Sequence, residues 1–220
     1  MTSDTNYLKK KFGKSLIFKE NLSKYSWFNL GGPADIFFRP NNKDDLIEFL
    51  TEVKDKGDKM SILGAGSNTL IRDSGVRGVV IKLSSKFSDL KLIDKNTIET
   101  GAATLDRKVA DFAKNNNISG LEFLSCIPGT VGGAIIMNSG CYGSDISKIL
   151  LSIRILDKKG QEKEIQKDEI EFYYRSTNIS ENYIIISAKF KGVASTKKLI
   201  EKKQNELIER KKKSQPSQVK

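Results

Sequence analysis

The sequence contains no histidine and only two cysteines among its 220 residues. Without histidine, a Ser-His-Asp or Cys-His nucleophile, a His-ligated zinc ion and a histidine general base are all excluded. Cys126 and Cys141 are too few for a four-cysteine zinc site, and one pair is a poor disulfide framework for a chain of this size. They are interpreted as small packing residues. Proton transfer must therefore use carboxylates, Lys, Tyr, Ser or a bound cofactor.

Long hydrophobic runs are also missing. No stretch reaches the roughly 18 apolar residues of a membrane span, and residues 1–24 carry no apolar block that ends in a cleavage site. The expected location is therefore cytoplasmic, without a membrane partner. With 38% hydrophobic and 30% charged residues, the composition is typical of a globular protein of one large domain or two small ones.

The net charge of +11 lies at the two ends of the chain. Residues 1–24 carry six Lys against two acidic residues, and residues 197–220 carry nine Lys or Arg against three Glu, which leaves 23 basic and 22 acidic residues between them. A nucleic-acid-binding domain carries its basic stripe on its folded face. The nearly neutral body argues against a nucleic-acid partner.

The hydrophobic pattern predicts two small units that mix helices and strands. In the first, an amphipathic helix around residues 46–53 precedes strands at Ser61–Leu63 and Val79–Leu83. In the second, a hairpin over residues 90–100 precedes a helix capped by Thr104. The remaining expected elements are strands at Ile149–Leu156, Glu162–Ile165 and Tyr183–Phe190, and a Lys/Glu-rich helix at Thr196–Lys213. The expected organisation is a polar lead over 1–22, subdomains over 23–84 and 85–195, and a basic connector over 196–220.

A glycine-rich segment, Gly64-Ala65-Gly66-Ser67-Asn68, directly follows one of these strands. Glycines allow the backbone to approach a phosphate, and successive free N–H groups form a nest that binds anions. The segment is not a Rossmann fingerprint, because Thr69 stands where the third Gly or Ala belongs, and it is not a Walker A motif. An ordinary tight turn is the alternative interpretation.

A second candidate segment, Ile127–Ala134, has Pro or Gly at four of its eight positions. This composition predicts neither a regular helix nor a central strand. Because the segment is otherwise apolar, we expect it to be buried, and its N–H groups then need partners. A large polar cofactor would supply them; protein groups and water are the alternative. Together, the two segments indicate a bound dinucleotide.

A third candidate is Arg175, which follows three aromatic residues in Phe172–Ser176 (FYYRS). An arginine flanked by aromatic rings is often a surface cation–π stack. Alternatively, it stabilises negative charge that develops on a substrate.

Four motifs in this order resemble the UDP-N-acetylenolpyruvoylglucosamine reductase family: YSWFNLGGPA at Tyr25–Ala34, ILGAGSNTLI at Ile62–Ile71, GLEFLSCIPGTVGGAIIMNSGCYG at Gly120–Gly143, and FYYRS. The resemblance runs from about residue 21 to 220, and the long third motif is the specific one. Cys126 and Cys141 stand where small Gly or Ala residues are common in the family.

The resemblance implies an α+β fold of the FAD-binding PCMH (vanillyl-alcohol-oxidase-like) type, with two subdomains that hold FAD between them. It also implies the cofactor-binding residues, which are Gly64, Ala65, Gly66, Ser67, Asn68, Thr69, Pro128, Gly129, Thr130, Gly132, Gly133, Ala134, Asn138 and Gly140. No metal is implied. Since no side chain can store a hydride, the redox chemistry belongs to the cofactor.

In the family, NADPH reduces FAD, and the hydride then passes to the enolpyruvyl double bond of UDP-N-acetylglucosamine enolpyruvate. The product is UDP-N-acetylmuramate, a peptidoglycan precursor. By resemblance, Arg175 would stabilise the enolate-like intermediate, with Tyr174 beside it. The family also has a third domain with the proton-donating serine, and this sequence is expected to be a truncated chain. The alternative is an FAD-binding module without turnover, and the oligomeric state stays open.

Overall fold

The computed structural model describes residues 3–54 and 59–215, and its first sheet is built from four strands in the order β1-β2-β4-β3. The strands are β1 (Leu16–Asn21), β2 (Pro33–Phe38), β3 (Met60–Ile62) and β4 (Val76–Ile81). β1 runs antiparallel to β2, whereas β2 and β3 run parallel to β4. The predicted amphipathic helix is confirmed as α2 (Lys43–Val53), capped by the Asn42 side chain, which accepts a hydrogen bond from the backbone N of Asp45 at 2.8 Å.

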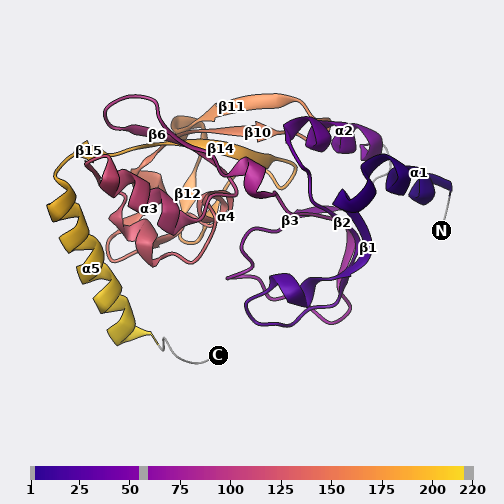
Figure 1. The fold of residues 1–220 in the computed structure, drawn as a ribbon, viewed down its shortest axis with the longest axis horizontal. Coiled ribbons are helices and arrows are strands. Elements are labelled where there is room, and N and C mark those ends of the chain that lie inside the picture. Colours follow the sequence, from indigo (N-terminus) through magenta and orange to yellow (C-terminus); the bar gives the residue numbers. More distant parts are fainter. Residues whose placement is uncertain (1–2, 55–58, 216–220) are drawn as a thin grey trace.

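The second sheet has five strands in the order β11-β10-β14-β6-β5, and all neighbours are antiparallel. Its strands are β5 (Leu90–Leu92), β6 (Thr97–Gly101), β10 (Leu150–Leu156), β11 (Glu162–Gln166) and β14 (Ile184–Lys191). These confirm the predicted hairpin and the three later strands. Figure 1 shows this sheet across the top of the molecule, with α3 (Asp106–Asn115) and α5 (Lys197–Ser214) at one end and the first sheet at the other.

Short elements fill the region below the second sheet. They include the helix α4 (Val131–Ile136) and the 3₁₀ turns η4 (Glu122–Cys126) and η5 (Ile146–Lys148). Three two-stranded ribbons pair β7 (Ile118–Ser119) with β15 (Val193–Ala194), β8 (Gly140–Cys141) with β9 (Ser144–Asp145), and β12 (Phe172–Tyr173) with β13 (Ser176–Thr177). In the part of the chain that the structure describes, no helix has both the length and the hydropathy that crossing a bilayer requires.

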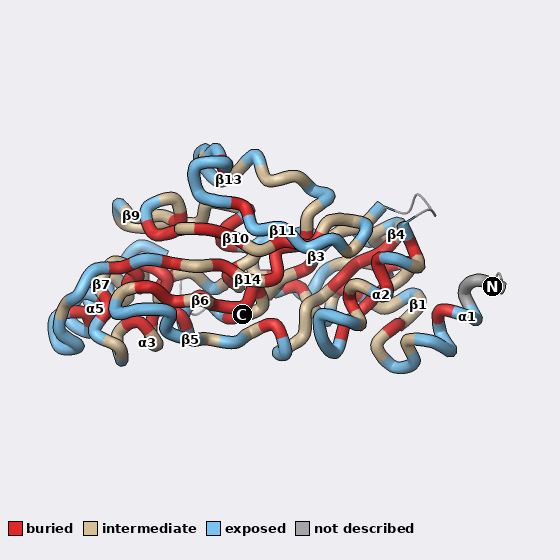
Figure 2. Tube along the Cα trace, turned by 90° about the horizontal axis from the view of Figure 1, so that it is seen from above, coloured by how far each residue is buried: buried red, intermediate tan, exposed pale blue. Residues whose placement is uncertain are grey.

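The two sheets share part of their hydrophobic core. Phe38 of β2 stacks on Phe49 of α2 with ring centroids 4.0 Å apart, and Leu156, Ile184 and Ile186 of the second sheet are buried in the same cluster. Figure 2 shows the buried residues concentrated in β14, β6 and α3 on one side and in α2 and β4 on the other. Since the first sheet ends at residue 81 and the second begins at residue 90, we propose a subdomain boundary near residue 84.

The expected polar lead is in fact part of the first sheet. Helix α1 (Ser3–Phe12) precedes β1, and the ring of Phe12 packs edge-on against Phe38 and Phe49 at 5.4 and 5.5 Å. Leu8 and Leu16 are buried. Leu8 and Phe12 lie four positions apart among lysines, so they share one side of α1. The lysine-rich composition gave no indication of this apolar side. Residues 1–2 lie outside the described residues.

Two local predictions were wrong. Thr104 does not cap the following helix: α3 begins at Asp106, and the buried Thr104 hydroxyl has no hydrogen-bond partner among the described residues. Its backbone O instead accepts from Val131 N at 2.9 Å. Residues 131–136 are helical despite two glycines, because Pro128 lies before the helix and not inside it. At Gly132, a Cβ would lie 3.3 Å from the Ala102 Cβ, so the glycine lets α4 approach closely.

The predicted Lys/Glu-rich helix is confirmed as α5, with the Thr196 side chain accepting from Leu199 N at 3.4 Å. The helix is docked on the second subdomain. Ile200 and Gln204 are buried, and Gln204 Nε2 donates to the Ala110 O of α3 at 3.1 Å. The last expected connector residues, 216–220, lie outside the described residues.

Candidate functional site

A cavity of about 1090 Å³ brings together segments that are far apart in the sequence. Its walls come from β3 and the loop after it, from residues 126–134 with α4, and from the ends of β8 and α5. Of the residues expected to contact a cofactor or substrate, those that line it are Gly64, Ala65, Gly66, Ser67, Asn68, Thr69, Pro128, Gly129, Thr130, Gly132, Gly133, Ala134, Gly140 and Arg175. Asn138 and Tyr174 are not in its lining.

The two glycine-rich segments meet at the wall of this cavity. A Cβ on Gly64 would lie 2.6 Å from the Thr130 Oγ1, so only a glycine lets the loop after β3 reach the second segment. Gly66 adopts a φ of +69°, and a Cβ there would lie 1.8 Å from the Tyr25 O. The Gly66 O accepts from Trp27 N at 3.0 Å. The loop after β3 is therefore held by its carbonyl groups and pressed between Tyr25 and Thr130.

This loop has free backbone N–H groups. Among residues 3–54 and 59–215, the N–H groups of Gly64–Asn68 donate to no other group, whereas Ser67 and Asn68 lie in a hydrogen-bonded turn and the carbonyl groups of Gly64, Gly66 and Thr69 all accept hydrogen bonds. Successive free N–H groups that face a cavity form an anion-binding nest. The loop therefore contains a tight turn at Ser67–Asn68 and also has free N–H groups that an anion could accept from, so both interpretations of the segment stay open.

The second segment, Ile127–Ala134, is held by backbone hydrogen bonds to Thr104 and Asp106, whereas several of its other N–H groups have no acceptor among the described residues. Asp106 N donates to Gly129 O at 3.1 Å, and Thr104 O accepts from Val131 N, which together form an isolated bridge between Leu105 and Thr130. The N–H groups of Gly129, Thr130 and Gly133 donate to no acceptor within the described residues. A Cβ at Gly133 would contact only the Thr130 Oγ1, at 3.7 Å, and would otherwise occupy open space.

A buried carboxyl lies directly behind this segment. Asp106 is fully buried, and neither of its carboxyl oxygens has a hydrogen-bond partner among the described residues. A Cβ on Gly129 would come 2.8 Å from the Asp106 Oδ2. Burial raises the pKa of Asp106 to about 8, so the carboxyl is mostly protonated at neutral pH.

Arg175 lies at the edge of the cavity, in the turn between β12 and β13. Its φ is +57°, in the left-handed region, and its Nη2 donates to the Gly140 O of β8 at 3.0 Å. Its guanidinium lies 5.3 Å from the centre of the Tyr174 ring. Tyr174 itself is 90% exposed. The cation–π stack is confirmed, and because Arg175 also lines the cavity, its role toward a substrate stays a prediction.

Asn138 supports the site without lining it. Its Nδ2 donates to the Tyr173 O at 3.1 Å, and its Oδ1 accepts from Ser147 N at 3.1 Å. With a φ of +38°, it turns the chain from α4 toward β8. Asn138 connects the turn that carries Arg175 to η5, and its contact with a cofactor stays a prediction.

The sequence reasoning missed Lys82, which lines the cavity beside the loop after β3. Its Nζ donates to the Gly64 O, and it lies 5.9 Å from the centre of the Tyr25 ring. Burial, with a smaller contribution from the Arg39 charge, lowers the pKa of Lys82. The only sequence signal is a single Lys at the end of the apolar strand β4, which is not distinctive by itself.

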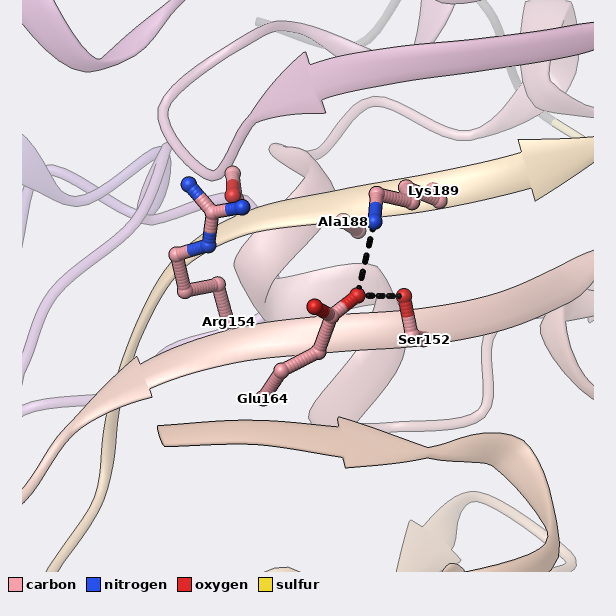
Figure 3. Close-up of a pocket in the computed structure, with 6 residues that line it drawn as sticks. Ser152, Arg154, Glu164, Ala188 and Lys189 are labelled. Carbon is pink, nitrogen blue, oxygen red and sulfur yellow. Dashed lines mark hydrogen bonds and ion pairs between the residues drawn. The ribbon is translucent and has the colours of Figure 1, made fainter. Parts of the chain in front are cut away.

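A second, very small depression lies on the outer face of the second sheet (Figure 3). There Glu164 accepts from the Ser152 Oγ at 2.7 Å and from the Lys189 Nζ at 2.8 Å. The Lys189 and Ser152 hydrogen bonds lower the pKa of Glu164. Because these groups satisfy one another, the cluster is a surface ion-pair network and not a ligand site. Among the described residues, no cluster of His, Cys, Asp and Glu is suited to a metal ion.

Comparison with protein families matches residues 34–166 to the family described as "FAD binding domain". Among curated proteins, the chain is 46% identical over 203 residues to the UDP-N-acetylenolpyruvoylglucosamine reductase of Pelagibacter ubique (strain HTCC1062), covering 92% of this chain and 67% of that protein. It is 44% identical to the protein of the same name from Wolbachia sp. subsp. Drosophila simulans, covering 89% and 65%. The chain spans about two thirds of the length of these relatives.

Among solved structures, the chain is similar to the UDP-N-acetylenolpyruvylglucosamine reductase of Thermus caldophilus. The TM-score is 0.79 at 27% identity, covering 92% of this chain and 70% of that one. It also resembles alkyldihydroxyacetonephosphate synthase, with a TM-score of 0.61 at 14% identity over 87% and 40% of the two chains, which supports the fold alone. These similarities confirm the α+β, FAD-binding PCMH-type fold expected from the sequence.

Proposed function

This chain belongs to the UDP-N-acetylenolpyruvoylglucosamine reductase family, and from that premise we propose that its cavity holds FAD for the reduction of UDP-N-acetylglucosamine enolpyruvate by NADPH. The observation that carries the proposal is the pairing of free backbone N–H groups from two glycine-rich segments in one large cavity. A reaction that uses NADPH also agrees with the cytoplasmic location expected from the sequence.

The residues present fit an FAD molecule. Its diphosphate needs hydrogen-bond donors without nearby carboxylates, and Gly64–Asn68 offers a run of free N–H groups beside the Lys82 cation. The N–H groups of Gly129, Thr130 and Gly133 offer donors on the opposite segment. The Asp106 carboxyl behind them stays mostly uncharged at neutral pH, since burial raises its pKa, and so does not repel the anion.

When bound, FAD supplies the hydride transfer, which no protein side chain can provide. The protein's own contribution is binding, orientation and charge. Arg175 lies at the cavity edge with its guanidinium directed by the Gly140 O and the Tyr174 ring. In this position it would stabilise negative charge that develops on the enolpyruvyl group as the double bond is reduced.

Tyr174 would act through Arg175, because its exposed ring is not in the cavity lining but lies against the guanidinium. Asn138 would hold the same turn from the other side through the Tyr173 O. Both are therefore proposed as positioning residues for Arg175. The UDP-sugar substrate is taken from the names of the relatives.

The narrower alternative is flavin binding without turnover. It is favoured by one observation: the family model that matches residues 34–166 is described as an FAD binding domain. Two measurements separate the candidates. An absorbance titration with FAD tests the cofactor site, and chromatographic detection of UDP-N-acetylmuramate formed with NADPH tests turnover.

The variant that tests the cofactor site most directly is Gly133→Ala. Its Cβ makes only an ordinary contact with Thr130 and otherwise projects into open space, and alanine favours the helix α4. We expect an unchanged or higher melting temperature together with at least tenfold weaker FAD binding. The control is Gly13→Asn, distant from the cavity, where a φ of +54° suits asparagine and nothing lies within 4 Å.

Full flavin affinity in Gly133→Ala would show that the cofactor does not lie against α4. Failure of the unmodified chain to bind FAD would refute both candidate functions. Binding without product would leave the narrower alternative.

A further inference from the structure

The two cysteines of the chain lie next to each other at the cavity wall. Cys126 ends η4 and Cys141 ends β8, so fifteen positions separate them in sequence. η4 and β8 pack together, and both cysteines line the cavity. Cys126 is buried and Cys141 is half-buried, and both are free thiols in the structure. The packing interpretation made from the sequence did not anticipate this proximity.

The contacts of the two sulfur atoms place them within reach of each other. The Cys141 Sγ donates to the Phe123 O at 3.5 Å, one turn before Cys126 in η4. Burial, followed by the charge and the hydrogen bond of the neighbouring Cys126 thiol, raises the pKa of Cys141 to about 12. The Ser125 Oγ lies 3.8 Å from the Cys126 Sγ. The Cys141 thiol therefore lies against the same η4 turn that carries Cys126.

We propose that Cys126 and Cys141 form a reversible disulfide that locks η4 to β8 in the cavity wall. This modification site does not depend on the proposed function of the cavity. The oxidant is a low-molecular-weight disulfide, which enters the cavity to reach both sulfur atoms.

The reaction proceeds in two exchange steps. The Cys126 thiolate attacks the small disulfide, which forms a mixed disulfide and releases one small thiolate. The Cys141 thiol then loses its proton to solvent, and its thiolate attacks the Cys126 sulfur and releases the second small thiolate. Both small thiolates take up the two protons that the cysteines released. One protein disulfide forms while one small disulfide is reduced to two thiols.

The neighbouring charges assist the second step. Cys126 is one of the groups that raise the pKa of Cys141, and this effect ends once its sulfur is capped. Lys211 and Arg175 act in the opposite direction and lower that pKa. Burial, the largest cause, keeps the pKa of Cys141 raised throughout, and capping of Cys126 removes one of the smaller causes.

The bond would connect two parts of the wall that hold other cavity residues. The Cys126 O accepts from the Lys211 Nζ of α5 at 2.7 Å, and the Gly140 O, next to Cys141, accepts from Arg175 at 3.0 Å. Closing the loop between the cysteines also restricts the unfolded chain. Oxidation is therefore expected to raise the melting temperature and to change access to the cavity.

The test treats the purified chain with oxidised glutathione and follows its mass and its free thiols. The expected product is lighter by two hydrogens, has no free thiol, carries no glutathione and melts several degrees higher. Dithiothreitol should restore the starting mass and melting temperature. The single variants Cys126→Ser and Cys141→Ser, checked for folding by their melting curves, should form at most a stable glutathione adduct.

Two results would overturn the proposal: thiols in the unmodified chain that stay free, or glutathione adducts that accumulate without closing to the internal disulfide. An FAD titration of the oxidised chain adds a separate readout. If the disulfide forms and flavin affinity is unchanged, the disulfide proposal is supported and an effect of the disulfide on cofactor binding is excluded. If no flavin binds in either state, the proposed cofactor fails while the disulfide result remains valid.

Discussion

Replacing Asp106 by asparagine should make the protein more stable at neutral and alkaline pH, which is the reverse of the usual effect of changing a buried polar residue. Asp106 is fully buried with no hydrogen-bond partner among the described residues, and burial raises its pKa from 3.8 to about 8. The unfolded chain releases this proton above about pH 4. Between the two pKa values the folded state therefore binds one proton more than the unfolded state.

The sign and size of the effect follow from this difference in bound protons. The contribution of Asp106 to the free energy of unfolding is highest below pH 3.8, falls as the pH rises toward 8, and is level above it. The slope is about 1.4 kcal/mol per pH unit, so the carboxyl lowers stability by on the order of 4 kcal/mol between pH 5 and pH 8. Asparagine has a similar shape and does not titrate, so the Asp106→Asn variant should lose this slope.

The assay is urea unfolding of the unmodified chain and of the variant at several values between about pH 5 and pH 9. The chain has no histidine, so no imidazole titrates in this window to obscure the slope. Asp111→Asn is the matched control, since Asp111 lies in the same helix but is exposed and pairs with Lys114 at 3.2 Å. The control should keep the pH dependence of the unmodified chain.

The expected result is a stability difference between Asp106→Asn and the unmodified chain that grows by several kcal/mol from pH 5 to pH 8. If both proteins show the same slope, the carboxyl is ionised in the folded state and has a partner that the structure does not show. A variant that is destabilised equally at every pH would mean that the carboxyl accepts a hydrogen bond that the amide cannot replace.

Three further changes test the cavity and the docked helix. Arg175→Lys loses the hydrogen bond to the Gly140 O and should lower turnover about a hundredfold without lowering the melting temperature. Turnover is measured as NADPH-dependent formation of UDP-N-acetylmuramate. An unchanged rate would contradict the proposed role of Arg175. Lys82→Met removes a cation beside the loop after β3 and should weaken FAD binding about tenfold. The FAD affinity of the variant should also depend less on the salt concentration. Equal affinity and equal salt dependence would exclude Lys82 from the site. Ile200→Ala should cost about 2–4 kcal/mol in urea unfolding because Ile200 is a buried residue of α5, whereas Leu199→Ala, at a position of α5 that is 61% exposed, should cost little. Equal effects would mean that α5 is not docked.

Local sequence patterns were sufficient where short-range forces decide the structure. The spacing of Leu46, Phe49, Leu50 and Val53 predicted α2 because a helix buries one face, and the alternation in residues 149–156 predicted β10 for the corresponding reason in a strand. The glycine-rich segments line one cavity in the structure, and Gly66, with a positive φ and a Cβ position 1.8 Å from the Tyr25 O, admits no side chain; their contact with a cofactor stays a prediction.

Where the local pattern was ambiguous, long-range contacts decided the outcome. Helix α1 and strand β1 depend on packing against Phe38 and Phe49, which lysine-rich composition obscured. Threonine is a common residue type at helix N-caps, but the backbone O of Thr104 accepts from Val131 N, and α3 begins two residues later. Of the two glycines of α4, Gly132 faces Ala102, where a Cβ would lie 3.3 Å from the Ala102 Cβ.

By itself, the sequence determined the chemical classes available to this protein: no histidine chemistry, two backbone segments suited to an anion, and one arginine set among aromatic rings. Only the tertiary structure decided which groups meet. It brings Lys82 to the Gly64 O, turns Arg175 to Gly140 while leaving the Tyr174 ring in solvent, buries Asp106 behind Gly129, and sets Cys126 beside Cys141. The physical reason is that burial and proximity, which shift a pKa or pair two thiols, depend on contacts between residues distant in the chain, and these arise only when the two sheets and their loops pack together.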